Sequence, residues 1–258
     1  MVEKAPVTIA IITKNEEKRL PSCLETVTWA DEVLVLDDES TDQTVAVAKR
    51  YGARCFSRKM DVEGKHRNFV YQQAKHKWVL SLDADEHVTP ELAREIIEKV
   101  NLNDPQFSGY AIPMRIFIGT LWIRRAGYYP SARLKLFRRD KFHYEEAAVH
   151  PRVFLDGKCG QIRGEILHYS FRDVSHFMAK FNRETDLEAQ KWVEDKRKMN
   201  LGLALYKACD RFFRAYLMKK GYQDGFAGFI FSCFASWYQL LTYAKYWEIK
   251  QKKNQKAS

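Results

Sequence analysis

The feature that most constrains the fold is a series of short apolar segments that each end abruptly in polar or acidic residues. Residues 7–12, 33–36 and 78–82 are rich in Val, Ile and Leu, and segments with helical spacing separate them. Uninterrupted apolar runs of this length are typical of parallel strands buried on both faces. Strands that alternate with helices predict an α/β fold with a Rossmann-like, doubly wound sheet.

Polar clusters stand at the end of each predicted strand: residues 13–16, residues 37–38 and residues 83–86. Because ligands bind beyond the carboxyl ends of the strands in such sheets, we expect the three clusters to form one site. Asp83 and Asp85 lie on one turn, and two carboxylates suit a divalent ion such as Mg²⁺ or Mn²⁺ that shares substrate phosphates. The alternative is that these acids only stabilise the turn before a helix.

The rest of the chain divides into a mixed region and a helical region. A helix with Thr89 as its N-cap and Pro90 at its first position is predicted to reach about residue 100. Similarly, a helix is predicted to start at Ser40 or Thr41. Residues 109–137 alternate like antiparallel strands, which we expect to cover the site. We predict a catalytic domain over 1–172 and a helical extension over 173–258.

The positive charge is concentrated near the C-terminus. The chain carries a formal net charge of +10, of which residues 201–258 contribute +7. Residues 226–244 are nineteen uncharged residues, rich in aromatic side chains. We expect an amphipathic helix lying in a membrane surface, rather than a spanning or core helix, with its polar side formed by Ser232, Ser236, Gln239 and Thr242.

Cysteine usage and the N-terminus favour a cytoplasmic protein. The five cysteines are widely spaced without a Cys-x-x-Cys pair, which disfavours zinc and disulfides. The apolar run at residues 7–12 is too short for a signal peptide. Nucleic acid is a less suitable partner than a membrane, because the positive charge flanks an uncharged stretch instead of following a groove. We therefore expect peripheral attachment to the cytoplasmic face of the inner membrane.

Four motifs in this order resemble family 2 glycosyltransferases with the GT-A fold. They are ITKNE, LDDESTD, GKHRN and LDADE, at residues 12–16, 36–42, 64–68 and 82–86. Later segments at residues 133–138, 149–150 and 167–169 extend the match. Within the family, the sequence is most similar to lipopolysaccharide inner-core glucosyltransferases of the WaaE type.

The resemblance implies a UDP-sugar donor and its contacts. Asp37 or Asp38, after the second strand, would recognise the base and the ribose. The loop at residues 13–16 would line the same pocket. Lys65 and Arg67 would contact the nucleotide or its diphosphate. Asp83 would lie near the ribose or the donor sugar. The implied donor-binding residues are Thr13, Asn15, Glu16, Asp37, Asp38, Lys65, Arg67 and Asp83. The alternative role for Asp37 and Asp38 is helix capping. The alternative for Lys65 and Arg67 is a position on a solvated helix face.

The resemblance also implies the catalytic machinery. Mg²⁺ or Mn²⁺ would bind Asp85, with Asp83 nearby and His168 as a further ligand, unless His168 is only a structural hydrogen-bonding residue. Inversion at the anomeric carbon needs a general base that removes the acceptor proton. Of two adjacent carboxylates, we choose Glu146 over Glu145. The alternative is that both belong to an exposed acidic turn and that the base lies elsewhere.

The function implied is transfer of a hexose from a UDP-sugar to a lipid-linked saccharide. The narrower resemblance implies UDP-glucose as donor and an inner-core heptose of lipopolysaccharide as acceptor. Alternatives are another UDP-sugar with another lipid-linked or polysaccharide acceptor, a sugar nucleotidyltransferase, a basic nucleic-acid-binding protein, and a non-catalytic membrane scaffold. The sequence leaves the oligomeric state open.

Overall fold

The computed structural model describes residues 4–146 and 152–255, which form two compact units. The first unit comprises Met1–Arg115 and Ser131–His168. The second comprises Ile116–Pro130 and Tyr169–Ser258. The chain thus passes between the units within strands β7 (Met114–Ile118) and β13 (Ile166–Phe171). The predicted domain boundary after residue 172 stays a prediction.

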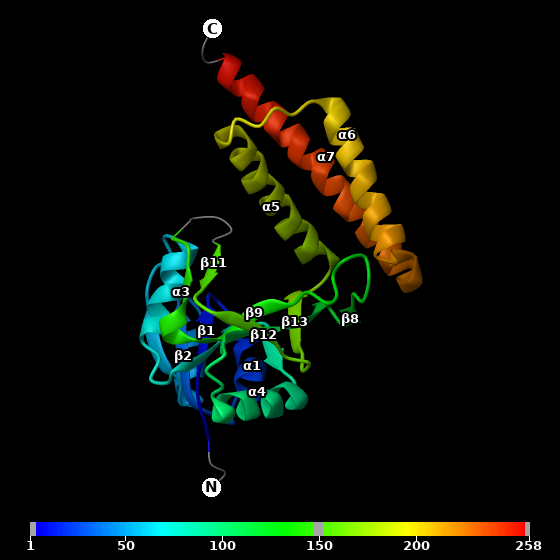
Figure 1. Ribbon diagram of the computed structural model, residues 1–258. Coiled ribbons are helices and arrows are strands. Elements are labelled where there is room, and N and C mark those ends of the chain that lie inside the picture. The colour runs from blue at the N-terminus through cyan, green and yellow to red at the C-terminus, as the bar shows by residue number, and fades with distance from the viewer. Residues whose placement is uncertain (1–3, 147–151, 256–258) are drawn as a thin grey trace. The chain divides into compact units, whose positions relative to one another are not determined.

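A seven-stranded mixed sheet forms the centre of the first unit (Figure 1), in the order β12-β6-β9-β4-β1-β2-β3. The four strands β3, β2, β1 and β4 are parallel neighbours, as the apolar runs predict. The strands of this sheet are β1 (Ala5–Thr13), β2 (Ala30–Asp37), β3 (Arg54–Ser57), β4 (Trp78–Asp83), β6 (Phe107–Ile112), β9 (Arg133–Arg138) and β12 (Lys158–Gln161).

The second half of this sheet departs from the expectation that residues 109–137 cover the site. Strand β9 pairs antiparallel with both β4 and β6, so β6 and β9 extend the main sheet instead of lying over it. The physical reason is burial, because Tyr110, Ile112, Leu136 and Phe137 are all at most 3% exposed and need cover on both faces of the sheet. The sheet is therefore mixed rather than wholly parallel.

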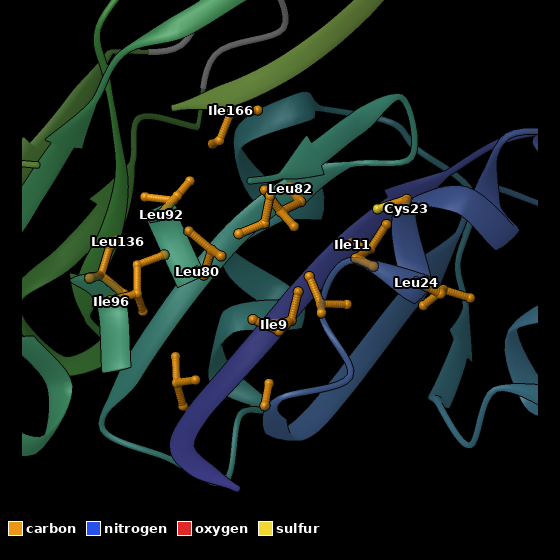
Figure 2. Packing of buried hydrophobic residues seen from close by; sticks show 14 of the residues in the cluster. Ile9, Ile11, Cys23, Leu24, Leu80, Leu82, Leu92, Ile96, Leu136 and Ile166 are labelled. Carbon is orange, nitrogen blue, oxygen red and sulfur yellow. The ribbon is translucent and has the colours of Figure 1, made fainter. Parts of the chain in front are cut away.

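Helices cover both faces of the sheet. Leu80 and Ile9 of the sheet pack with Leu24 of α1 and Ile96 of α4 in one cluster, which Figure 2 shows. A second cluster lies on the opposite face, where Tyr71 of α3 packs near the two-stranded pair of β10 and β11. The elements concerned are α1 (Leu20–Glu25), α2 (Thr44–Arg50), α3 (Glu63–Gln72), α4 (Pro90–Leu102), β10 (Phe142–Tyr144) and β11 (Val153–Leu155).

The helix starts show which capping predictions hold. The Thr89 side chain accepts a hydrogen bond from the Leu92 N–H, so the predicted N-cap is confirmed. The predicted start at Ser40 or Thr41 is wrong, because α2 begins only at Thr44. Instead, the Ser40 hydroxyl accepts a hydrogen bond from the backbone N–H of Asn15, in the loop after β1.

The second unit consists mainly of helices, with α7 lying alongside α5 and α6 (Figure 1). Aromatic side chains of α5 and α7 form its main apolar cluster, including Phe177, Phe181 and Phe231. The elements that complete the chain are β5 (Glu86–Val88), β8 (Leu121–Trp122), η1 (Arg139–Lys141), α5 (Val174–Glu194), α6 (Leu201–Phe213), η2 (Arg214–Met218), η3 (Gly221–Asp224) and α7 (Gly225–Gln255).

Helix α7 corrects the expectation of a water-facing polar side. Ser232 and Thr242 are completely buried, and their hydroxyls donate to the carbonyls of Gly228 and Tyr238 four residues earlier. The exposed residues include Phe226, which is 78% exposed. Along the described ranges, no helix has the length and apolar character needed to cross a bilayer. Attachment to a membrane surface stays a prediction.

Candidate functional site

Strand register brings the three predicted polar clusters to one edge of the sheet. Thr13 pairs with Asp37 across β1 and β2, and Ile12 pairs with Asp83 across β1 and β4. Parallel strands in register end together, so the strand-end side chains converge as the sequence predicts. The Thr13 hydroxyl donates to the Asp37 carboxylate over 3.3 Å.

Hydrogen bonds between the first two strand-end loops fix their geometry. The Asn15 backbone N–H donates to the Ser40 hydroxyl, and the Thr41 N–H donates to the Asn15 side-chain oxygen, each over 2.8 Å. Asp37 accepts from the Ser40 N–H over 2.8 Å, and the Glu16 N–H donates to the Thr44 hydroxyl over 2.8 Å. These contacts give Asp37 and Asn15 a structural role in the loops themselves.

Asp38 is a buried carboxylate, only 4% exposed, at the centre of the first cluster. It accepts hydrogen bonds from the Lys14 ammonium over 2.8 Å and from the Met60 backbone N–H over 2.7 Å. Burial acts to raise the pKa of Asp38, but these two donors outweigh burial and hold the pKa below its ordinary value. The carboxylate is therefore ionised and ready to accept hydrogen bonds from a ligand.

The second cluster joins the end of β4 to α3 and β9. The Asp83 carboxylate accepts from the Arg67 guanidinium over 3.1 Å and lies 3.9 Å from the Lys135 ammonium. Burial opposes ionisation, but Arg67 and Lys135 hold the pKa of Asp83 well below its ordinary value. Lys135 itself is 6% exposed and binds Glu86 over 2.7 Å. Buried charges here are paired, as burial requires.

Asp85 and His168 face each other at the same edge, with 3.5 Å between the carboxylate Oδ1 and the imidazole Nε2. Arg19 approaches the other carboxylate oxygen of Asp85 over 3.4 Å. Burial would raise the pKa of Asp85, yet His168 and Arg19 hold it below its ordinary value. The His168 Nδ1 atom is buried and has no hydrogen-bond partner among the described residues.

These donors fit a divalent ion held partly by substrate. An ionised carboxylate oxygen and an imidazole nitrogen are both acceptable ligands for Mn²⁺, and phosphate oxygens commonly complete such a shell. Within residues 4–146 and 152–255, no three His, Cys, Asp or Glu side chains gather into a ready-made metal site. Asp85 and His168 would therefore hold the ion, whereas Asp83 is turned toward Arg67.

Helix α3 fixes the segment that carries the two candidate bases. The Asn68 side chain bridges the Tyr144 backbone, donating to its carbonyl over 2.9 Å and accepting from its N–H over 2.8 Å. Gly64 lies so close that an added Cβ would stand 1.9 Å from the Glu145 carbonyl oxygen. Glu146 is exposed and lies 3.7 Å from the Lys65 ammonium.

A polar cavity of about 420 Å³ adjoins Asp83 in the first unit. Its lining combines cationic side chains, a carboxylate pair and the Tyr144 ring, so it can take a strongly polar ligand. The lining residues are Glu63, Arg67, Asp83, Arg133, Leu134, Lys135, Tyr144 and Val153.

The predicted site residues thus fall into two groups. Thr13, Asn15, Glu16, Asp37 and Asp38 lie together at the ends of β1 and β2. The second group has two parts: Arg67, Asp83, Asp85 and His168 lie near the end of β4, and Lys65, Glu145 and Glu146 lie beside α3, where the Lys65 ammonium is 3.7 Å from Glu146. Val149 and His150 of the matching motif lie outside the described residues.

Sequence reasoning missed Arg19 and Lys135, and it placed Glu86 in the polar cluster at residues 83–86 without giving it a role. Lys135 stands between Leu134 and Leu136 in the sequence of β9, and a lysine inside an apolar strand is a usable signal of a buried charge partner. Arg19 carried no comparable signal, because its pairing with Asp85 joins residues far apart in the sequence.

Comparison with known proteins assigns the class that this sheet edge suggests. The model of the family described as "Glycosyl transferase family 2" matches residues 8–160. The chain therefore belongs to glycosyl transferase family 2, it is a glycosyltransferase, and its mixed α/β sheet is that of the GT-A fold.

Individual relatives are more distant. The chain is 25% identical to the lipopolysaccharide core biosynthesis glycosyltransferase LpsC of Rhizobium meliloti (strain 1021), over 96% of this chain and 94% of that protein. It is 28% identical to an uncharacterized glycosyltransferase of Rickettsia bellii (strain RML369-C), over 93% and 85% of the two chains. Among solved structures, TarS 1-349 of S. aureus superposes with a TM-score of 0.47 at 14% identity, covering 96% of this chain and 91% of that chain.

Proposed function

We propose that this glycosyltransferase moves a hexose from a UDP-sugar, namely glucose from UDP-glucose, to a heptose of a lipopolysaccharide inner core. The observation that carries the proposal is the convergence of Asp38, Asp83 and Asp85 at one sheet edge with His168. Similarity along nearly the whole chain to a protein named for lipopolysaccharide core biosynthesis supports the acceptor class. The acceptor would be lipid-linked, and transfer would invert the anomeric centre.

Each cluster has a distinct task in this proposal. Asp38 accepts hydrogen bonds from the uracil or ribose, because it is ionised and held in place by the Lys14 ammonium and the Met60 N–H. Asp85 and His168 hold Mg²⁺ or Mn²⁺, which when bound offsets the charge that develops on the leaving diphosphate. Arg67 and Asp83 line the polar cavity in which the donor sugar would lie.

The acceptor hydroxyl needs a base on the side opposite the leaving group. Glu146 is exposed, and its backbone is held near α3 through the close approach of Gly64 to residue 145. We assign Glu146 as the group that accepts the proton, at its carboxylate oxygen, while the hydroxyl oxygen attacks the anomeric carbon. Glu145 instead accepts a hydrogen bond from the Arg152 N–H over 3.2 Å.

The test is UDP release by the purified chain with Mg²⁺ or Mn²⁺, across a panel of UDP-sugars, with and without a heptose-terminated truncated lipopolysaccharide. We expect acceptor-stimulated release with UDP-glucose, and loss of that release in Asp85→Asn. Asp61→Asn is the matched control, because Asp61 is an exposed acid paired with Arg58. Stimulation by another UDP-sugar or only by another acceptor would replace the donor or acceptor named here, and no release from any donor would overturn the proposal.

A further inference from the structure

The helical unit contains a cavity that the donor site does not explain. Its volume is about 330 Å³, and its walls come from α5, α6, α7, the end of β13 and the loop around residue 128. Most of the wall is aromatic, and three side chains are hydrophilic. The lining residues are Tyr128, Phe171, Phe177, Phe181, Glu184, Arg211, Phe234, Ala235, Tyr238 and Gln239.

The aromatic side chains of the cavity wall pack against one another. Phe177 lies 5.1 Å from Phe234, and Phe181 lies 5.6 Å from Tyr238, measured between ring centroids. Phe234 and Tyr238 are nevertheless partly exposed, so ring surface remains open at the cavity. Ring packing of this kind holds the exposed faces in place without requiring a ligand.

Polar groups line the cavity beside these rings, with Glu184 and Arg211 exposed to solvent. Across the described part of the chain, the side chains of Glu184, Arg211 and Gln239 form no hydrogen bond or ion pair. The phenol groups of Tyr128 and Tyr238 likewise have none, and burial raises the pKa of each to about 12, so both keep a proton to donate. The cavity therefore offers a carboxylate, a guanidinium, an amide and two hydroxyls beside open ring faces.

This combination matches a saccharide better than an acyl chain. A sugar ring has an apolar C–H face that can cover an aromatic ring, and its rim of hydroxyls both donates and accepts hydrogen bonds. An acyl chain would cover the half-buried Gln239 amide and the phenol groups of Tyr128 and Tyr238 without offering them hydrogen bonds, which is unfavourable. Small-ligand sites usually combine apolar walls with a few converging polar groups, as this cavity does.

We propose that this cavity binds saccharide residues of the acceptor, away from the sugar that receives the hexose. The identification of this saccharide as part of the acceptor rests on the proposed function. Saccharide binding by the cavity is argued independently of that function. The cavity selects by stacking on the aromatic walls and by hydrogen bonds to Glu184, Arg211 and Gln239.

The direct test is isothermal titration of the full chain with a deacylated inner-core oligosaccharide that ends in heptose. We expect saturable binding that Arg211→Ala weakens about tenfold or more, because a hydrogen bond from a charged group is lost. Arg214→Ala is the matched control. Arg214 lies three residues further along the chain, pairs with Asp210 and does not line the cavity.

Kinetics with the acylated acceptor separate this site from the catalytic centre. We expect Arg211→Ala and Glu184→Gln to raise the KM for acceptor about tenfold while leaving kcat and acceptor-independent hydrolysis of the UDP-sugar unchanged. Circular dichroism and urea unfolding establish that the variants fold like the wild type. Both residues are exposed, so their substitution removes little packing.

The outcomes distinguish the two proposals. If the wild type transfers sugar but does not bind the deacylated oligosaccharide, or if Arg211→Ala and Arg214→Ala behave alike, the saccharide site is wrong and the proposed function stands. Binding of the acylated acceptor alone would mean that the cavity holds a lipid chain and would also overturn the inference. Oligosaccharide binding that depends on Arg211 in a chain without transfer activity would support the site and overturn the proposed function.

Discussion

At the residue scale, the site is a set of buried or half-buried carboxylates that each have a cationic partner. Asp38 binds Lys14, Asp83 binds Arg67, and Asp85 lies between Arg19 and His168. These partners favour the ionised form of each acid at neutral pH. The sheet edge thus carries ionised acids together with cationic side chains, which are groups suited to a divalent ion and to phosphate oxygens.

The two candidate bases give the first residue-scale prediction. Glu146→Gln should lower kcat by about 10²- to 10⁴-fold with little change in the KM for UDP-sugar, because a general base acts only in the chemical step. Glu145→Gln is the matched variant and should retain most activity, since Glu145 is engaged with Arg152. The measurement is steady-state transfer. A larger loss of kcat in Glu145→Gln than in Glu146→Gln would mean that Glu145 is the base.

Gly64 gives the second residue-scale prediction. Ala normally stabilises a helix interior relative to Gly by roughly 0.5–1 kcal/mol. Here the new Cβ would stand 1.9 Å from the Glu145 carbonyl oxygen, so the helix or the 145–146 segment must move. We expect Gly64→Ala to destabilise the protein in urea unfolding and to lower kcat.

Gly202 serves as the control for that substitution. Gly202 also lies in a helix, α6. A Cβ added there would stand 3.5 Å from the Asn200 side-chain oxygen, which is an ordinary van der Waals contact. Gly202→Ala should therefore be neutral or slightly stabilising. Equal effects of the two substitutions on kcat would contradict the role given to the close approach at Gly64.

At the element scale, helix α3 links the end of β4 to the segment that carries the two candidate bases. Its Arg67 reaches Asp83 at the end of β4, and its Asn68 holds the backbone of Tyr144 at the end of β10. The two contacts come from neighbouring residues on one short helix. A shift of α3 would therefore move the contact with Asp83 and the segment of the candidate bases together.

Capping supplies the element-scale prediction. Thr89→Ala should lower the free energy of unfolding by about 1 kcal/mol, because the Leu92 N–H loses its side-chain acceptor. Gln43→Ala is the control at the start of α2, where the N-cap side chain makes no capping hydrogen bond, and it should have little effect. Urea unfolding measures both; an equal loss in the two variants would argue against a specific cap at Thr89.

The sequence predicts elements well where apolar periodicity is strong and poorly where tertiary contacts decide. The runs at residues 7–12 and 78–82 become parallel strands because they are buried on both faces. In contrast, a helical wheel cannot show which face of α7 is covered. The hydroxyls of Ser232 and Thr242 bond to carbonyls of their own helix, so both residues can be buried although the sequence places them on a polar side.

At the scale of the whole molecule, each unit has its own apolar cluster and its own candidate ligand site. Strand-end convergence could be predicted because β1, β2 and β4 are parallel and end together. The sequence could not predict the pairing of Arg19 with Asp85 or the cavity of the helical unit, because both depend on residues that are distant in sequence.

Acid sensitivity is a whole-molecule prediction that follows from the lowered carboxyl pKa values. A carboxyl whose pKa is lower in the folded state stabilises the fold above its unfolded pKa, and this contribution is lost as the pH falls through the folded value. The pKa values of Asp38, Asp83 and Asp85 are all lowered. We expect the free energy of unfolding to fall as the pH drops below about 4.

Asp38→Asn isolates one contribution to that acid sensitivity. The variant should be less stable than the wild type at neutral pH, and the difference should shrink as the pH falls below the unfolded pKa of aspartate. Urea unfolding at a series of pH values measures this. A constant difference at every pH would mean that the charge of Asp38 does not stabilise the fold.

Association with a membrane surface is the second whole-molecule prediction. Met218 and Phe226 are 74% and 78% exposed, and Lys219 and Lys220 lie between them in the sequence. Because apolar and cationic groups together favour anionic bilayers, the full chain should bind phosphatidylglycerol vesicles, more weakly at high salt. Phe226→Ser should weaken vesicle binding about tenfold.

An exposed aromatic residue of the first unit provides the control for vesicle binding. Tyr51 is 43% exposed, so Tyr51→Ser removes an exposed ring from another surface. Co-sedimentation should show unchanged binding for this variant. Equal loss in both variants, or no binding by the wild type, would contradict attachment through the helical unit.

The central claim is that the acids at the ends of β1, β2 and β4 bind a nucleotide diphosphate together with a divalent ion. Isothermal titration of UDP into the full chain, with and without Mn²⁺, tests it most directly. We predict Mn²⁺-dependent binding that is lost in Asp85→Asn and retained in Asp61→Asn. Binding of equal strength in both variants, or binding indifferent to Mn²⁺, would contradict the claim.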